Sequence, residues 1–317
     1  MIEHNKRDLI YKIARDYYQE NRTQQEIANK LGISRIMVSR LLARAVEERI
    51  VEIRINIPDT SCFETERQIE ERFGLSEAIV VACNSDEYDE ILKQLGAAAV
   101  DFLFRNLKGN ETISISWGYS LLAMINAIPR ASYPKMTITQ MIGGLSFPEE
   151  HMSGTELVRR ISNSLNAGAI LLNSPGIVKE RDLCAALKDE PQVNLALEKA
   201  KTSDMAFVGI GHFGVDSPLR QPGAIFSPAD LQLLDKHGAV GDISLRFFNE
   251  KGAFINGEID DRVVGLSIEE IRNIPRVAGI AGGKQKWPTI RAALETDVLD
   301  ILITDDKTAK ELLIQTE

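Results

Sequence analysis

The segment from Ser34 to Arg44 carries side chains that can contact nucleic acid, at the spacing of one helical face. Arg35, Ser39 and Arg40 fall on the side of this segment away from its apolar residues. Arginine can form two parallel hydrogen bonds to guanine, and it also pairs with phosphates. We therefore expect this face to bind duplex DNA. The predicted DNA-contacting residues are Thr23, Gln24, Gln25, Ser34, Arg35, Ile36, Ser39, Arg40 and Arg44.

Two short helices joined by a tight turn must position these side chains. Thr23 and Glu26 have the spacing of a capping box, and Gly32 is the residue type that most readily ends a helix in a left-handed conformation. Ser34 is the expected cap of the second helix. The apolar side of that helix is expected to contain Val38, Leu41, Leu42 and either Ile36 or Met37. The pattern predicts a helix-turn-helix, with an αα-hairpin bearing a solvated basic face as the alternative.

The residues on either side complete a small N-terminal domain, expected over residues 1–57. An apolar face repeats through residues 7–19 and predicts a helix that braces the pair. Residues 51–56, VEIRIN, alternate apolar and charged side chains. They are interpreted as either a wing, with Arg49 and Arg54 near the DNA backbone, or a solvated edge strand. Pro58 and Asp59 break the pattern and mark the start of the second domain, residues 58–317.

Charge is divided unevenly between the two domains. The whole chain has a net charge of −9, but residues 1–56 hold 11 Lys or Arg against 8 Asp or Glu, a net charge of +3, which leaves −12 for the remainder. A basic head on an acidic body is expected where one small part contacts DNA. Three scattered cysteines without a CxxC spacing and apolar runs too short to span a membrane predict a reduced, cytoplasmic protein without a membrane partner.

Apolar β-rich runs alternate with helical patterns throughout the second domain. The predicted strands are residues 78–82, 112–117, 136–142, 169–172, 205–210, 277–281 and 299–304. The predicted helices between them are residues 91–107, 119–127, 156–165, 183–187, 193–200, 229–236, 268–272, 289–294 and 309–313. Residues 247–255 are predicted to form a hairpin. The alternation indicates an α/β fold with a doubly wound, Rossmann-like sheet.

Four strand ends in this domain have residues suited to a ligand. SWGYS (Ser116, Trp117, Gly118, Tyr119 and Ser120) enters a helix whose first N–H groups could hold an anion. IGGLS contains Gly143 and Gly144, GDIS contributes Asp242 for hydroxyl groups, and AGGKQK contains Gly282, Gly283 and Lys284, suited to phosphate. Each motif alone is more simply a tight turn. Together, at the carboxyl ends of one sheet, they predict a polyhydroxylated, anionic ligand.

Catalytic, metal and dinucleotide motifs have weaker support. GIGHFG, residues 209–214, fits GxGxxG but is followed by Asp216, Ser217 and Pro218, which indicate a loop where a dinucleotide site requires a helix. Its Gly211 and His212 are expected at the pocket mouth. The four histidines show no zinc-site spacing, and neither a GxSxG elbow nor a P-loop is present. We predict no catalytic residue, no metal and no cofactor.

The order of these motifs resembles the SorC-type bacterial transcription regulators. The resemblance rests on Tyr17–Tyr18, TQQEIANKLGISRIMVSRLLARA, SWGYS, IGGLS, VGIG, AVGDISLRFF and AGGKQK, and it covers nearly the whole chain. It implies a C-terminal domain similar to sugar-phosphate isomerases and deaminases, with a phosphorylated sugar or related metabolite as effector, and a homodimer or homotetramer. It further implies a pocket lined by Trp117, Gly118, Asp242, Gly283 and Lys284. The deoxyribonucleoside branch is similar but carries a Schiff-base lysine where this chain has Ile142, which argues against a covalent effector bond.

We therefore expect a regulator of carbohydrate metabolism genes that binds double-stranded operator DNA under control of a phosphorylated sugar, and that is not an enzyme. One alternative is a sugar-phosphate isomerase or hydrolase with a DNA-binding appendage, because a fold alone does not specify a chemistry. Another is a metabolite-binding protein whose head contacts only other proteins.

Overall fold

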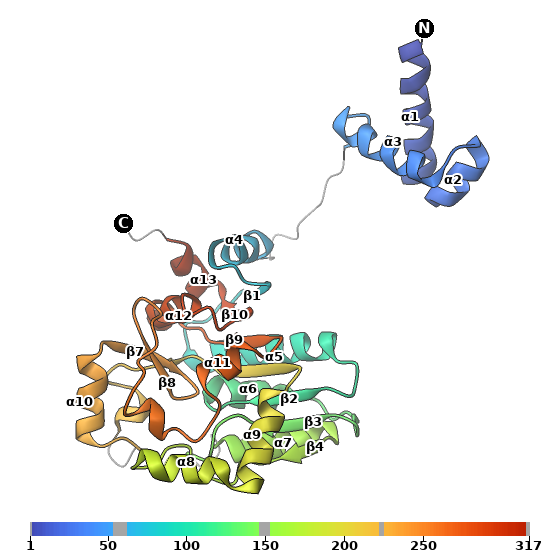
Figure 1. The fold of residues 1–317 in the computed structure, drawn as a ribbon. Coiled ribbons are helices and arrows are strands. Elements are labelled where there is room, and N and C mark those ends of the chain that lie inside the picture. Colours follow the sequence, from blue (N-terminus) through green and yellow to red (C-terminus); the bar gives the residue numbers. More distant parts are fainter. Residues whose placement is uncertain (1, 53–61, 146–152, 222–224, 315–317) are drawn as a thin grey trace. The chain divides into compact units, whose positions relative to one another are not determined.

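A computed structural model describes residues 2–52, 62–145, 153–221 and 225–314. The chain divides into two compact units, Met1–Asp59 and Thr60–Glu317 (Figure 1). The first unit contains α1 (Ile2–Tyr18), α2 (Gln24–Leu31) and α3 (Arg35–Glu47). Val51 and Glu52 are not in a strand, and the rest of the predicted wing lies outside the described residues.

The first unit is held together by one apolar core shared among its three helices. Its fully or nearly fully buried side chains are Ile10, Ile13, Ala14, Ile27, Ala28, Val38, Leu41, Leu42 and Ala45. The prediction that Ile36 or Met37 would join this core is wrong, because these side chains are 72% and 40% exposed. Helical geometry turns both away from the face that Val38, Leu41 and Ala45 share.

The second unit is built on a seven-stranded, wholly parallel sheet in the order β1-β10-β9-β5-β2-β3-β4. Its strands are β1 (Glu77–Val81), β2 (Thr112–Ile115), β3 (Thr137–Gln140), β4 (Gly168–Ile170), β5 (Met205–Gly209), β9 (Val277–Ile280) and β10 (Ile301–Asp305). These are the seven strands predicted from the sequence. The doubly wound α/β fold is confirmed.

Helices cover both faces of this sheet (Figure 1). The described helices of the second unit are α4 (Phe63–Phe73), α5 (Tyr88–Asn106), α6 (Tyr119–Ala127), α7 (Gly154–Leu165), α8 (Arg181–Asp189), α9 (Pro191–Lys201), α10 (Pro228–Lys236), α11 (Ile268–Arg272), α12 (Trp287–Leu294) and α13 (Asp306–Leu313), with short 3₁₀ turns η2 (Pro218–Arg220), η3 (Asp260–Arg262) and η4 (Lys284–Lys286). In β5, Phe207 packs into the core with α5–α7, whereas Ala206 and Val208 pack into the opposite core with α12 and α13. Strands buried on both faces explain the continuous apolar runs of the sequence.

A second, three-stranded antiparallel sheet was not expected. It contains β6 (Gly211–His212), β7 (Ala239–Ile243) and β8 (Arg246–Asn249). The prediction that Asp242 ends a strand of the main sheet is therefore wrong, because Asp242 lies within β7. The predicted hairpin over residues 247–255 is present as β8 and its return, with Phe248 bridged to Phe254.

Candidate DNA-binding face and ligand cavity

The local capping of α2 and α3 follows the sequence prediction in detail. The Thr23 N–H donates to Glu26 Oε2 at 2.8 Å, and Glu26 N–H donates to Thr23 Oγ1 at 3.3 Å, which is a capping box. Gly32 ends α2 at φ 66° and ψ 31°, the left-handed conformation that glycine adopts without strain. Ser34 caps α3 by accepting from Met37 N–H at 3.2 Å. The structure therefore forms the predicted helix-turn-helix.

The outward face of α3 presents unengaged cations. Arg35, Ser39 and Arg40 are exposed, and Arg35 and Arg40 have no hydrogen-bond or ion-pair partner among the described residues. Ile36 is exposed on the same helix. Arg44 differs, because its Nε pairs with Glu48 one turn further along. Thr23, Gln24, Gln25 and Arg35 line a shallow hollow together with Arg22.

The first helix supports this face through an ion pair in which the carboxylate is buried and the lysine is partly exposed. Lys30 Nζ on α2 lies 2.7 Å from Asp16 Oδ2 on α1, and the Asp16 side chain is 2% exposed. The hydrogen bond from Lys30 holds the pKa of Asp16 below its ordinary value. This contact agrees with the expectation that the helix over residues 7–19 supports the helix-turn-helix.

In the second unit, a cavity of about 290 Å³ lies where the chain reverses its direction across the main sheet. After β2 the chain moves outward through β3 to β4, and it returns with β5 to the other side of β2. Neighbouring strands whose connections run to opposite sides leave a crevice at their carboxyl ends. Ser116–Gly118 follow β2 and Gly209–Ile210 end β5, and both segments line the cavity.

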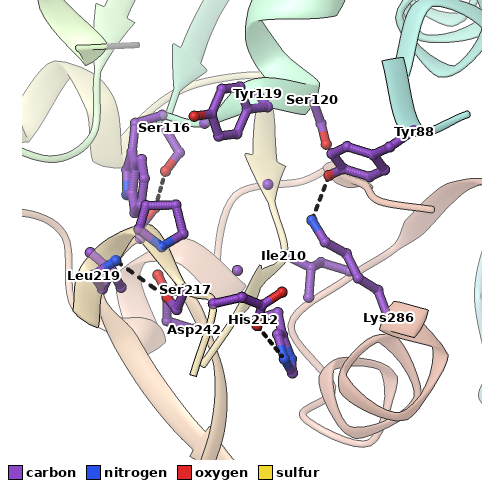
Figure 2. Close-up of a pocket in the computed structure, with 17 residues that line it drawn as sticks. Tyr88, Ser116, Tyr119, Ser120, Ile210, His212, Ser217, Leu219, Asp242 and Lys286 are labelled. Atoms are coloured by element: carbon purple, nitrogen blue, oxygen red, sulfur yellow. Dashed lines mark hydrogen bonds and ion pairs between the residues drawn. The ribbon is translucent and has the colours of Figure 1, made fainter. Parts of the chain in front are cut away.

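Residues from four further segments complete the wall (Figure 2). The lining residues are Tyr88, Ser116, Trp117, Gly118, Tyr119, Ser120, Gly209, Ile210, Gly211, His212, Asp216, Ser217, Pro218, Leu219, Asp242, Ser244 and Lys286. Eight of the predicted effector-binding residues are brought together here: Ser116, Trp117, Gly118, Tyr119, Ser120, Gly211, His212 and Asp242. Gly209 lines it as well, so the GIGHFG segment lies at the cavity as expected.

The remaining predicted residues lie elsewhere. A Cβ on Gly143 would be 2.4 Å from the Pro175 carbonyl oxygen, and the backbone of Gly144 hydrogen-bonds to the segment that contains Pro175. These two glycines therefore allow the two backbone segments to approach closely. Ser146 of that motif lies outside the described residues. Gly283 and Lys284 line an adjoining hollow that shares Tyr88, His212 and Lys286 with the cavity. Gly282 lies against Asp305.

Asp242 is the most unusual group of the cavity. Its side chain is 2% exposed, Oδ2 accepts from Leu245 N–H at 2.9 Å, and Oδ1 has no partner. Burial raises the pKa of this carboxyl to about 6, against the smaller opposing effects of the Leu245 bond and the Lys286 charge. A buried oxygen without a partner costs free energy that a hydroxyl donor from a ligand would recover.

The position of Asp242 depends on a strained turn after β7 and on a glycine, Gly211, on the neighbouring strand. Ser244 and Leu245 join β7 to β8 with φ of 55° and 61°, although neither is glycine. Such conformations persist only where the surroundings enforce them, and here Leu245 is fully buried and Ser244 Oγ lies 2.6 Å from Ser116 Oγ. Gly211 pairs opposite Asp242, and a Cβ there would be 2.0 Å from Oδ1.

The opposite side of the cavity carries groups suited to an anion. Gly118, at φ 120°, precedes α6, and the first N–H groups of a helix favour negative charge. Lys286 Nζ donates to Tyr88 Oη at 2.5 Å (Figure 2). Neither Tyr88 nor Lys286 was among the effector-binding residues predicted from the sequence. AGGKQK contained a signal for Lys286, but nothing near Tyr88 in the sequence pointed to it.

His212 is fixed by a chain of hydrogen bonds. Thr289 Oγ1 donates to the Val240 carbonyl at 3.2 Å and lies 3.0 Å from His212 Nδ1. The other ring nitrogen of His212, Nε2, lies 3.6 Å from Asp216 Oδ1. His212 is therefore oriented by structure and presents one nitrogen at the cavity.

Two further observations concern absent features. Among the described residues, no group of three or more His, Cys, Asp or Glu could hold a metal ion. No described helix has the length and apolar character needed to cross a membrane.

A helix-turn-helix unit with free outward arginines, joined to an α/β unit with a polar cavity at its switch point, defines a ligand-responsive transcription regulator. The Sugar-bind family model, a sugar-binding domain, matches residues 58–314, and a model of sigma-70 region 4 matches residues 12–48. The chain belongs to the SorC family of sugar-binding transcriptional regulators.

Characterised relatives match over almost the whole chain. The deoxyribonucleoside regulator of Bacillus subtilis is 28% identical over 312 residues, covering 98% of this chain and 99% of the relative. The sorbitol operon regulator of Klebsiella pneumoniae is 28% identical over 311 residues, covering 96% and 97%. The crystal structure of that full-length regulator superimposes with a TM-score of 0.73 at 27% identity, covering 98% of this chain and 100% of the other.

Proposed function

We propose that the chain binds operator DNA through α3 and that a phosphorylated sugar in the cavity of the second unit controls this binding. The observation that carries the proposal is the unpartnered, buried Asp242 Oδ1 in a cavity that also contains the start of α6 and Lys286. A carboxylate accepts from hydroxyl groups, and a helix N-terminus with a lysine favours a phosphate. A polyol phosphate satisfies both requirements, because its hydroxyl groups can donate to the carboxylate and its phosphate can lie at the helix start near the lysine.

The genes under control are those of carbohydrate metabolism. This inference is supported by the relatives, one of which is named a sorbitol operon regulator and another a deoxyribonucleoside regulator. Ile142, where the resemblance puts a Schiff-base lysine, is a buried apolar side chain. The effector therefore binds without a covalent bond to that position.

The chain acts in the cytoplasm as a homodimer or homotetramer and not as an enzyme. Its three cysteines are free, which suits a reducing compartment. Paired helix-turn-helix units contact half-sites one DNA turn apart, so an oligomer gives the geometry that operators require. Mass photometry of the full chain tests the subunit number.

The direct test is a thermal-shift screen of pentose and hexose phosphates with the full chain, because a ligand of the folded state raises its melting temperature. We expect at least one sugar phosphate to stabilise the wild type and to stabilise Asp242→Ala much less. The parent sugar without phosphate should have little effect. Turnover of any stabilising compound would contradict the non-enzymatic assignment, and stabilisation by none of them would contradict the proposed ligand.

A further inference from the structure

Asp305 connects two parts of the second unit that the proposed effector mechanism must link. It is the last residue of β10 and is fully buried. Its Oδ1 accepts from the N–H groups of Lys307 at 3.1 Å and Thr308 at 2.9 Å, which caps α13. Its Oδ2 accepts from Thr308 Oγ1 at 2.6 Å and from Gly283 N–H at 2.7 Å. One carboxylate therefore holds the start of α13 and the segment after β9.

The segment after β9 belongs to the ligand site. Gly283 precedes η4, and its carbonyl accepts from Lys286 N–H at 2.8 Å, which closes the turn. Lys286 lines the cavity, and Gly283 lines the adjoining hollow. The contact with Asp305 is tight, since a Cβ on Gly282 would be 2.5 Å from Asp305 Oδ2. Lys286 is therefore connected to Asp305 through the turn that begins at Gly283.

The helix that Asp305 caps packs against α4. Arg72 Nη1 donates to the Leu313 carbonyl at 2.9 Å, and the fully buried side chains of Leu312 and Ile69 share one apolar core. Figure 1 shows α13 beside α4. A second contact comes from the segment after β1, because Cys83 N–H donates to Asp306 Oδ1 at 3.0 Å.

In turn, α4 is joined to the sheet through its own carboxylates. Glu70 accepts from Ala78 N–H and Glu66 from Val80 N–H, both at 2.8 Å, so α4 covers the open edge of β1. Along the chain, α4 is the described element of the second unit that directly follows the segment leading from the DNA-binding unit. Its position is thus set by α13 and β1 together.

We propose that Asp305 is a positioning residue that couples occupancy of the cavity to the placement of α4, and through α4 to operator affinity. The inference rests on the proposed function, because it requires an effector at Lys286. The ligand moves the η4 turn, Asp305 transfers the movement to the first turn of α13, and α13 shifts α4. Because the ligand favours one of two arrangements, occupancy changes the population of the form that binds DNA.

The test compares the full chain with its Asp305→Asn variant. The probe is the pentose or hexose phosphate that raises the melting temperature of the wild type most. Calorimetry gives its dissociation constant, and fluorescence anisotropy gives operator affinity with and without a saturating amount. Since an amide nitrogen cannot accept a hydrogen bond, the variant loses the bond to Gly283 or part of the α13 cap. We expect probe affinity within about threefold of wild type, but a fold-change in operator affinity reduced at least threefold.

Two other variants separate coupling from stability. Ser227→Ala uncaps α10, which has no hydrogen bond or ion pair to η4 among the described residues, so it should lower the melting temperature and leave the fold-change intact. Arg72→Ala removes the α4–α13 bond at an exposed position, and should reduce the fold-change even if Asp305→Asn does not fold.

The outcomes distinguish the two proposals. A wild type whose operator affinity does not respond to any stabilising sugar phosphate overturns the proposed function and this coupling with it. A responsive wild type with equally responsive Asp305→Asn and Arg72→Ala variants overturns the coupling alone.

Discussion

At the scale of single residues, the proposed DNA-binding face contains two arginines, Arg35 and Arg40, that have no hydrogen-bond or ion-pair partner among the described residues. Replacing Arg35 and Arg40 by alanine leaves the buried face of α3 intact, because Val38, Leu41 and Ala45 supply its packing. Each base-contacting arginine contributes about 1–3 kcal/mol. We expect the double variant to bind operator roughly 100-fold or more weakly, measured by fluorescence anisotropy at fixed salt.

A matched loss of charge on the second unit serves as the control. Arg130 and Arg181 are exposed residues there. The Arg130→Ala, Arg181→Ala protein should keep operator affinity within a few-fold of wild type. Equal affinities for all three proteins would remove α3 as the recognition helix.

Asp242 makes a second prediction at this scale, because its folded pKa of about 6 lies above the ordinary value of 3.8. The folded state therefore binds more protons than the unfolded state between these pH values, and the free energy of unfolding falls as pH rises through this window. Two pKa units correspond to about 3 kcal/mol. We expect Asp242→Asn to be more stable than wild type by up to about 3 kcal/mol at pH 8, with no advantage below pH 4.

Urea denaturation at the two pH values measures this difference, and Asp101→Asn, an exposed aspartate on α5, is the control. The same substitution should weaken sugar-phosphate binding at least tenfold, since an amide accepts hydroxyl donors less strongly than a carboxylate. A variant no more stable than wild type at pH 8 would show that the buried Asp242 carboxylate does not lower the free energy of unfolding. Stability given up at a binding group is a common feature of functional sites.

At the scale of elements, the brace between α1 and α2 predicts how the DNA-binding unit responds to acid. The folded pKa of Asp16 is lowered, so its contribution to stability is present above the unfolded pKa and is lost as pH falls through the folded value. A hydrogen bond to a charged partner contributes about 2 kcal/mol. Asp16→Asn should therefore destabilise α1–α3 by about that amount at pH 7 and much less in strong acid.

Amide hydrogen exchange within α1–α3 measures this local stability. Asp8→Asn, an exposed aspartate on the same helix, should exchange like the wild type. Protection in Asp16→Asn equal to wild type at pH 7 would mean that the Lys30 pair contributes nothing. Operator binding by Asp16→Asn should recover on cooling, unlike that of the arginine variant.

Elements differed in how far the sequence could predict them. The central strands of the parallel sheet are buried on both faces, so a strand such as Met205–Gly209 is a continuous apolar run that can be recognised locally. By contrast, Ala239–Ile243 contains a glycine and an aspartate and resembles a loop. It is a strand because Gly211–His212 and Arg246–Asn249 pair with it, and pairing across the chain leaves no local pattern.

The residues of the cavity could likewise be predicted only where a local sequence pattern marks them. Glycines and polar residues directly after β2 and β5 could be assigned to it because strand ends of one sheet converge. Tyr88, from the start of α5, meets Lys286 across almost 200 residues of chain, and no sequence spacing encodes that contact. Within AGGKQK, the 3₁₀ turn directs Lys286 to the cavity and Lys284 towards Glu311, a choice that depends on backbone geometry.

At the scale of the whole molecule, the chain joins two units with net charges of opposite sign. In the proposed function, the first unit presents cations to DNA, and the second binds a ligand near Asp242 and Lys286. Control of one by the other is a coupling free energy, typically 1–3 kcal/mol, and it must be reciprocal. Saturating operator DNA should therefore change the affinity for the sugar phosphate by the same factor as the sugar phosphate changes the affinity for DNA.

The most direct test of this account is a titration of labelled operator with the full chain, with and without a saturating stabilising sugar phosphate. The account predicts operator dissociation constants that differ by about 5–150-fold, and a difference that largely disappears when Asp242→Asn is titrated at the same effector concentration. Identical dissociation constants for the wild type in both conditions, with the compound demonstrably bound, would contradict it.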